Sequence, residues 1–345
     1  MQRLIWVDIL KGVGILCVVG GHIVEGRINA LLYLFHMPLF FFIGGFLFRP
    51  RENRREYFRA KLLHLGLPYA AFLFVLYAPN LVAKILHSGD VSLRQVAIML
   101  GKPVLGGRWL GGYMDIFWFL PCFFVVQQLA NYMVTRFSKK QVLVLTSGML
   151  AMSYLNAIFL PSVRFPLNVN VALGALPLFL AGFLFKDLHE RRACYLMAIP
   201  LAAVFLILTA AEFPLAYHMR RGDYGVAGIS FIAAISVIVS LVFLSKRLAG
   251  VPVLAQSLIR LGGASMVIMY VHKVIQWWMK EHLLVQSPLG LFAASAVASF
   301  GIYLVLGQFR LSRILFLGSR RDPAGALSRA NSSGDRQNGA TDAGT

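Results

Sequence analysis

Long apolar stretches separated by short polar ones dominate the chain. A hydrocarbon layer about 30 Å thick needs roughly 20 apolar residues per crossing helix. By that length criterion ten stretches are candidate membrane spans, near residues 4–25, 31–48, 62–86, 113–134, 142–160, 169–186, 193–212, 225–245, 262–280 and 288–309. The pattern predicts an all-α protein, a polytopic bundle of about ten transmembrane helices.

The composition agrees with lipid as the main solvent. Hydrophobic residues make up 58% of the chain and charged residues 14%, whereas an average soluble domain carries about 25% charged residues. The first apolar stretch runs into a second without a small-residue cleavage site, so we expect a transmembrane helix there and no cleavable signal peptide. The three cysteines are widely spaced, and no cluster has zinc-ligand spacing, so no metal site is expected.

The formal net charge of +19 comes from short Lys and Arg clusters between the apolar stretches. If the N-terminus is cytoplasmic, about two thirds of the 33 Lys and Arg residues fall in segments predicted to lie inside. This bias is what the positive-inside rule requires, so it predicts that both termini are cytoplasmic. Because topology accounts for the charge, we expect no nucleic-acid partner.

Three further segments carry expectations of their own. Residues 87–112 form the longest outside loop, and their glycines predict irregular structure. Residues 248–260 predict an interfacial helix on the inner leaflet. Residues 319–345 are polar and predict a disordered cytoplasmic tail, which leaves residues 1–318 as the transmembrane domain.

The first span carries four ionisable residues, which are costly in a membrane unless paired or hydrated. Lys11 and His22 are eleven residues apart, so they share one helix face about 16 Å apart along the axis. Asp8 lies one turn before Lys11 and can neutralise it, and Glu25 lies one turn after His22 and can orient its imidazole.

His22 and Lys11 each have two interpretations. His22 is a candidate general base or acyl carrier, because histidine titrates near neutral pH; alternatively it is a buried polar residue bonded to a neighbouring helix. Lys11 is a candidate for binding an anionic donor; alternatively its charge extends to the inner interface.

A second histidine, His36, opens the second span on the same predicted side as His22, so the two rings can converge. The alternative is an interfacial residue in an aromatic belt. Gly44 and Gly45 follow and predict close helix packing.

Two later spans add polar candidates. Asp115 and Trp118 open the fourth span. A carboxylate and an aromatic ring are suited to binding a glycan; the alternative is that they anchor the helix at the membrane interface. Ser265 and His272 are seven residues apart on one face of the ninth span, where they either line a reaction cavity or make structural hydrogen bonds. The remaining histidines are expected at the membrane interface; they are His64, His87, His189, His218 and His282.

In this order the segments resemble the membrane acyltransferase-3 family, particularly its fucose-4-O-acetylase-like and exopolysaccharide-acetylating members. Lys11 and His22, within DILKGVGILCVVGGH, fit the family's motif of a basic residue, ten intervening residues and a histidine. The other matching segments are FHMPLFFFIGG at 35–45, WFLPCFF at 118–124, ALPLFLAGFLF at 175–185 and GGASMVIMYVH at 262–272. The resemblance covers roughly residues 3–310.

The resemblance implies a multi-pass enzyme of the bacterial inner membrane. Acetyl-CoA would enter from the cytoplasm, and the acetyl group would pass to a hydroxyl of a cell-surface or lipid-linked sugar. Lys11 would help to bind the donor, His22 would be essential for transfer, and His36 and His272 match family histidines. Because the CoA phosphates are anionic, Arg51, Arg54 and Arg55 join Lys11 as candidate donor ligands; topology alone also explains that cluster.

Two alternatives stay open at this point. A transporter or flippase for a lipid-linked sugar would also use intramembrane charges, with Asp8 and Lys11 as coupling residues, although the sequence shows no inverted repeat. A non-catalytic partner of polysaccharide-assembly proteins would make Lys11 and His22 dispensable. The acceptor sugar, its hydroxyl and the length of the acyl group are open as well.

Overall fold

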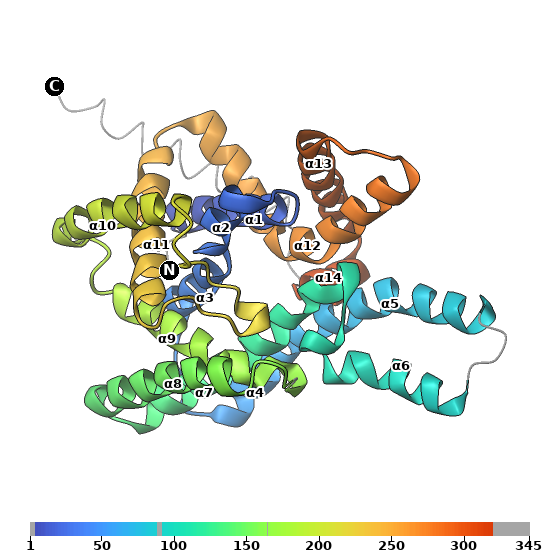
Figure 1. Cartoon of the computed structure of the whole chain (residues 1–345), viewed down its shortest axis with the longest axis horizontal. Helices are drawn as coiled ribbons and strands as arrows, with labels where there is room; N and C mark the ends of the chain where they lie inside the picture. The colour runs from blue at the N-terminus through green and yellow to red at the C-terminus, as the bar shows by residue number, and fades with distance from the viewer. Residues whose placement is uncertain (1–3, 88–91, 164, 320–345) are drawn as a thin grey trace.

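The computed structural model describes residues 4–87, 92–163 and 165–319, and this part of the chain is a bundle of helices (Figure 1). The α-helices are α1 (Ile5–Gly21), α2 (Gly26–Tyr33), α3 (His36–Leu47), α4 (Arg54–Lys61), α5 (Leu67–His87), α6 (Leu93–Leu105), α7 (Phe119–Arg136), α8 (Lys139–Phe159), α9 (Val169–Phe185), α10 (Arg192–Ala210), α11 (Ile229–Leu248), α12 (Pro252–His282), α13 (Pro288–Leu306) and α14 (Arg310–Leu317). A π-helical turn, η1 (Leu62–Gly66), joins α4 to α5, and a 3-10 segment, η3 (Gly112–Trp118), precedes α7.

Nine helical segments of the described residues are long and apolar enough to cross a membrane. They are Gly26–Leu47, Arg54–Ala83, Gly112–Arg136, Lys139–Phe159, Pro166–Phe185, Arg192–Ala210, Ile229–Leu248, Pro252–His282 and Pro288–Leu306. Each overlaps one of the ten predicted stretches, so the prediction of an all-α polytopic bundle is confirmed.

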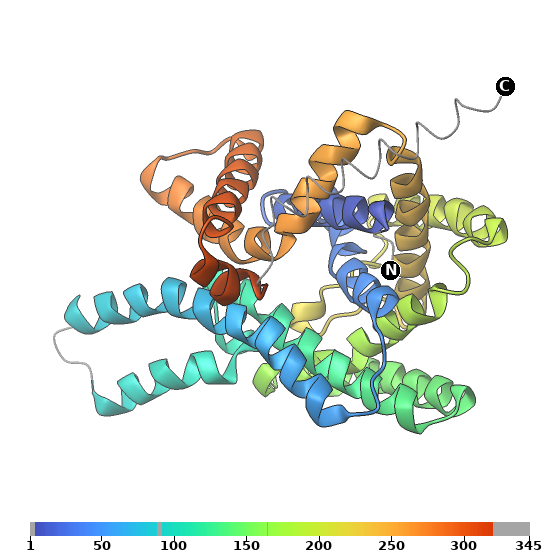
Figure 2. The same ribbon diagram turned by 180° about the vertical axis from the view of Figure 1, so that it is seen from behind.

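The remaining predicted stretch forms α1, which is shorter than these nine. Its 17 residues span about 26 Å at 1.5 Å per residue. Ten of them are buried, and the helix packs against α12, α11 and α3 in the middle of the bundle (Figures 1 and 2). The shortest span is therefore also a central one.

Glycines let α1 and α12 touch backbone to backbone. A Cβ atom on Gly262 would lie 2.1 Å from the carbonyl oxygen of Asp8, and one on Gly12 would lie 2.2 Å from that of Leu258. Both distances are far below van der Waals contact, so only glycine fits at these two positions. Small residues at helix crossings are the usual means of close approach in membranes.

The predicted close packing at Gly45 is also confirmed. A Cβ atom there would lie 1.6 Å from the carbonyl oxygen of Phe179 in α9, and one on Gly182 would lie 1.9 Å from that of Phe42 in α3. The two crossings place α1 against α12, and α3 against α9.

Several segments predicted to lie inside meet at one end of the bundle. Lys186, after α9, donates to the carbonyl oxygen of Phe48, after α3. Lys246 in α11 donates to the carbonyl oxygen of His189 at 2.7 Å. The ring of Trp6, at the start of α1, lies 5.0 Å from that of Phe46. We call this the basic end; that it faces the cytoplasm stays a prediction.

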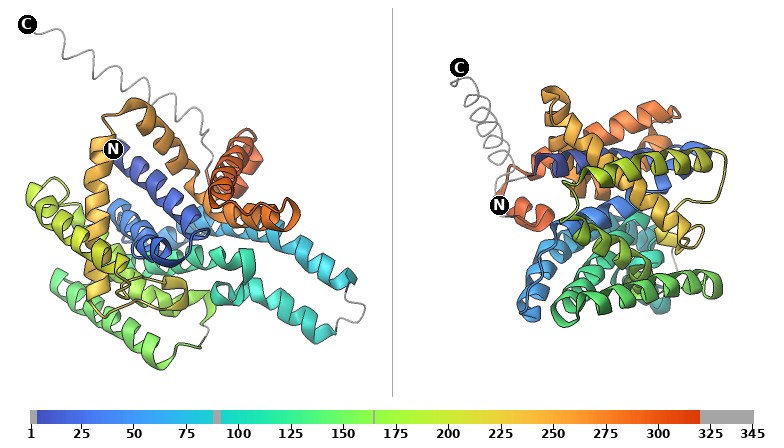
Figure 3. Two further views of the ribbon diagram at one scale, coloured as in Figure 1. Left: turned by 45° about the horizontal axis from the view of Figure 1, so that its top comes forward. Right: turned by 90° about the vertical axis from the view of Figure 1, so that its left-hand side faces the viewer.

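The prediction of irregular structure over residues 87–112 is wrong for residues 93–105, which form α6. A capping box begins this helix, because the Ser92 side chain accepts from the Gln95 amide and the Gln95 side chain accepts from the Ser92 amide. The Tyr77 hydroxyl of α5 donates to the Met99 carbonyl oxygen at 2.7 Å. The two helices project from the bundle as a pair (Figures 1 and 3).

The prediction of a separate interfacial helix over residues 248–260 is wrong as well. The helix that begins at Pro252 continues without a break to His282. Ala255 and Leu258 are buried against Ile9 of α1, so the first turns of α12 already belong to the core. Except for Ser319, the predicted tail over residues 319–345 lies outside the described residues.

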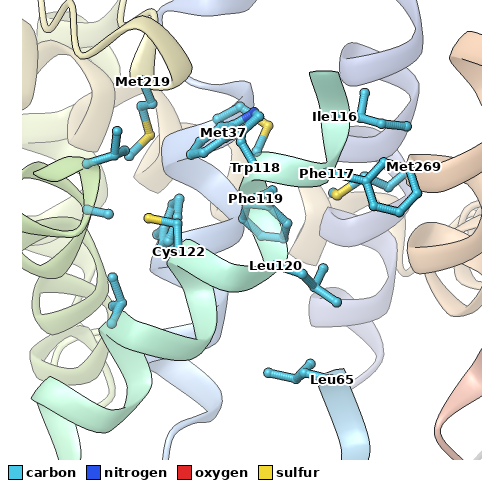
Figure 4. Packing of buried hydrophobic residues seen from close by; sticks show 14 of the residues in the cluster. Met37, Leu65, Ile116, Phe117, Trp118, Phe119, Leu120, Cys122, Met219 and Met269 are labelled. Atoms are coloured by element: carbon cyan, nitrogen blue, oxygen red, sulfur yellow. The ribbon is translucent and has the colours of Figure 1, made fainter. Parts of the chain in front are cut away.

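A buried cluster of aromatic side chains fixes η3 and the start of α7 (Figure 4). The ring of Phe117 packs on Tyr270 of α12 at 4.8 Å, and that of Phe119 stacks on Phe123 at 5.3 Å. Rings at these distances add about 0.5–1.5 kcal/mol per pair beyond their buried area. The segment that carries Asp115 and Trp118 is therefore held rigidly against α12.

The α1–α12 contact gives a stability prediction. Gly262→Ala places a methyl group against the Asp8 carbonyl oxygen and must push the helices apart, at a cost of about 1–3 kcal/mol. We expect a lower melting temperature of the purified protein in detergent. Gly263→Ala is the matched control, because its Cβ would meet the Tyr303 hydroxyl at 3.5 Å. Equal melting temperatures for the two variants would contradict the close contact.

Candidate active site

A polar cavity of about 260 Å³ lies at the end of α1 away from the basic end. Five segments build it: the turn after α1, α2, the start of α3, η3, and the loop between α10 and α11. Its lining residues are His22, Asn29, Tyr33, His36, Met37, Asp115, Trp118, Tyr217, His218, Met219, Arg220 and Arg221.

His22 sits at the C-terminal cap of α1, where the chain leaves the helix in a tight turn. The side-chain amide of Asn29 donates to the carbonyl oxygens of Gly21 at 2.8 Å and Val24 at 3.1 Å. These bonds satisfy carbonyl groups that the end of a helix leaves unpaired. The turn thereby stops α1 at the cavity and presents the imidazole to it.

Four imidazole rings and one phenol gather here. The ring centroid of His22 lies 5.3 Å from that of His272. Tyr33 stands among the others, with centroid distances of 4.5 Å to His36, 4.6 Å to His218 and 6.4 Å to His22. Titratable groups from four separate parts of the chain therefore lie close together at the cavity.

Backbone carbonyls determine the tautomers of two of these histidines. The Nδ1 atom of His36 lies 2.7 Å from the Leu32 carbonyl oxygen, and that of His272 lies 2.7 Å from the Ile268 carbonyl oxygen. A carbonyl only accepts, so each Nδ1 carries the proton and each neutral ring keeps a lone pair on Nε2. The Nε2 atom of His272 is buried without a hydrogen-bond partner among the described residues, and its ring lies beside His22.

His218 belongs to the loop between α10 and α11. Burial lowers the pKa of its imidazole; Asp223 opposes this effect and Arg221 adds to it, and the net direction is downward from the ordinary value of 6.5. This ring is therefore neutral at pH 7 and able to accept a proton.

An ion cluster closes one side of the cavity. Oδ2 of Asp115 lies 2.6 Å from Nζ of Lys273 in α12 and 3.7 Å from a guanidinium nitrogen of Arg220. Arg220 also donates to the Leu110 carbonyl oxygen at 3.0 Å. The carboxylate thus ties η3 to α12 and to the loop.

The same loop is fixed to α2 through its backbone. The Tyr217 amide donates to the Tyr33 carbonyl oxygen at 3.2 Å. Met219 is buried in the same apolar cluster as Met37 and Trp118 (Figure 4). These contacts place His218, Arg220 and Arg221 at the cavity.

A family model described as an acyltransferase domain matches residues 4–307, nearly the whole chain. The chain belongs to the acyltransferase-3 family. No curated protein and no solved structure matches it. Its family and its apolar helices together make it a multi-pass membrane acyltransferase.

The structure of this acyltransferase brings several candidate residues from the sequence together. His22, His36, Asp115 and Trp118 all line the cavity, and His272 lies beside His22. Their chemical roles stay predictions, but their convergence gives those roles a common location.

The remaining candidates lie elsewhere. Asp8 and Lys11 form the expected ion pair, at 3.3 Å, in the first half of α1. Glu25 is exposed and precedes α2, and Ser265 is two turns from His272; neither lines the cavity among the described residues.

The predicted donor arginines lie beyond α3. Arg51 is bonded to Glu56 at 2.9 Å, Arg54 stacks 4.8 Å above the ring of Tyr132, and Arg55 is exposed. No group of three or more His, Cys, Asp or Glu residues suited to a metal ion occurs in the described part of the acyltransferase.

Eight of the twelve lining residues were not candidates from the sequence. His218 was expected at the interface, whereas it is half-buried in the cavity. Tyr33, Tyr217, Arg220 and Arg221 drew no functional interpretation. One signal was available: two adjacent arginines in a segment predicted to lie outside run against the positive-inside rule.

The Asp115 cluster gives a second stability prediction. Asp115→Asn leaves Lys273 and Arg220 without their shared carboxylate. Because these groups are only 17–30% exposed, we expect a cost of about 1–3 kcal/mol, between that of a buried and an exposed pair. The melting temperature of the purified protein measures it.

Glu212→Gln is the matched control. It breaks the Arg27–Glu212 pair, whose side chains are 67% and 68% exposed, and exposed pairs contribute about 0–1 kcal/mol. If the two variants lost the same stability, the Asp115 cluster would not be a structural anchor.

Proposed function

We propose that this acyltransferase moves the acetyl group of acetyl-CoA to a hydroxyl of a cell-surface or lipid-linked sugar, in a bacterial inner membrane, as in the exopolysaccharide-acetylating branch of the family. The observation that supports this most is the convergence of His22 and His36 on one small polar cavity, with His272 beside His22. A sugar hydroxyl in that cavity would lie within reach of a base.

The donor would bind from the basic end. CoA phosphates are anionic, and Lys11, Arg51, Arg54 and Arg55 are the cations proposed to hold them. Lys11 and His22 are about 16 Å apart along α1, by helix geometry. The donor would therefore extend along α1, with its thioester toward His22.

Transfer then needs one base. The His22 imidazole takes the proton of the sugar hydroxyl, the oxygen attacks the thioester carbonyl carbon, and the C–S bond breaks to release CoA thiolate, which takes up a proton. The alternative is transient attachment of the acetyl group to the His22 ring nitrogen, followed by attack of the sugar hydroxyl. In both routes His272, with its lone pair on Nε2 beside His22, is suited to orient that ring.

Replacing His22 tests the proposal. His22→Ala should reduce acetyl transfer from acetyl-CoA to the native surface glycan by at least 100-fold, which is the lower range for loss of a general base. Acetyl groups on the glycan, measured by mass spectrometry in cells with matched protein levels, give the result. His282→Ala is the control, because His282 is exposed and remote from the cavity lining. Normal acetylation in the His22 variant would end the catalytic assignment.

A liposome assay separates this proposal from transport. Purified protein should consume acetyl-CoA and form acetylated sugar. Gradient-driven sugar flux in the absence of acetyl-CoA, without any acetyl transfer, would favour the transporter instead.

A further inference from the structure

The cavity carries more positive charge than its acidic groups can balance. Arg220 and Arg221 line it, and Lys273 reaches its edge, against the single lining carboxylate of Asp115. Asp223, in the same loop, accepts a hydrogen bond from the Gly225 amide and is exposed. Even with Asp223 counted, the cations are in excess.

Two guanidinium groups keep unused donors. Lys273 is engaged with Asp115 at 2.6 Å. Arg220 approaches the same carboxylate only to 3.7 Å, and its Nε atom is buried without a hydrogen-bond partner among the described residues. Arg221 is exposed at the cavity and has no ion pair within the described part of the chain.

A buried donor without a partner is unfavourable, and more so when the group is charged. A neutral sugar offers hydroxyl groups, which do not balance the charge. A carboxylate or a phosphate accepts hydrogen bonds and also balances the positive charge. Arginine binds these planar or tetrahedral anions through paired hydrogen bonds.

We infer that the acceptor carries an anionic group, a carboxylate or a phosphate, which Arg220 and Arg221 bind while the reacting hydroxyl lies among the histidines. The inference rests on the proposed function and names the class of its acceptor: an acidic sugar or a sugar phosphate. Arg221 is the specificity-determining residue, because its guanidinium has no ion pair among the described residues that would otherwise explain it.

Size and position favour the acceptor over the donor as the source of the anion. Pockets for drug-sized ligands measure about 300–1,000 Å³, and this cavity of about 260 Å³ is smaller. It suits a single sugar ring and not a whole CoA molecule. It also lies at the far end of α1 from the basic end, where the CoA phosphates are proposed to bind.

Binding measurements test the inference without relying on acetyl transfer. The full-length protein in detergent is titrated calorimetrically with methyl glucuronide, glucose 1-phosphate and methyl glucoside. We expect both anionic sugars to bind at least tenfold more tightly than the neutral one. Arg221→Gln should remove most of that difference.

Arg27→Gln is the matched control, because Arg27 is an exposed arginine paired with Glu212 outside the cavity lining. It should keep the anion preference. Equal affinity for all three sugars, or an unchanged preference in Arg221→Gln, overturns the inference. Loss of coenzyme A binding in Arg221→Gln also overturns it, since the arginines would then serve the donor.

Acetyl-CoA turnover by the same preparations separates this inference from the proposed function. An anion preference without any acetyl-CoA turnover removes the function and leaves the anion site. Turnover with methyl glucoside as good as with methyl glucuronide removes the inference and leaves the function.

Discussion

The structure depends on the backbone contact between α1 and α12. Gly12 and Gly262 bring the two helices together at a distance that any side chain would prevent. One result of that contact is that His22, at the end of α1, lies beside His272 of α12. His22 and His272, 250 positions apart in the sequence, are neighbours because Gly12 and Gly262 carry no side chain.

The second constraint is electrostatic. A carboxylate and an ammonium group away from water are costly unless they meet, and at Asp115 they meet across η3 and α12. The guanidinium of Arg220 adds the loop between α10 and α11. The packing of helices and the pairing of charges thus both position residues around the same cavity.

The sequence predicted the helices well and their ends less well. Hydrocarbon thickness dictates the length of an apolar stretch, so nine of the ten stretches reappear as long helices. The helical segment 93–105 was missed because the glycines of residues 87–112 indicated irregular structure; in the structure a capping box at Ser92 starts a helix there. Of the cavity, His22, His36 and Asp115 were predictable because charge and imidazole stand out in apolar surroundings. His218 and Arg221 were not, because only tertiary contacts such as Tyr217–Tyr33 bring their loop to the site.

The short length of α1 has a consequence for the transfer of a group across the membrane. At about 26 Å it is shorter than a hydrocarbon layer of about 30 Å. It ends at the polar cavity, whereas α12 continues for ten residues beyond His272. The distance along α1 from the basic end to the cavity is therefore shorter than the thickness of the hydrocarbon layer. On the proposed function, the activated group and its target approach each other across a shortened gap, and neither has to traverse the full width of the lipid.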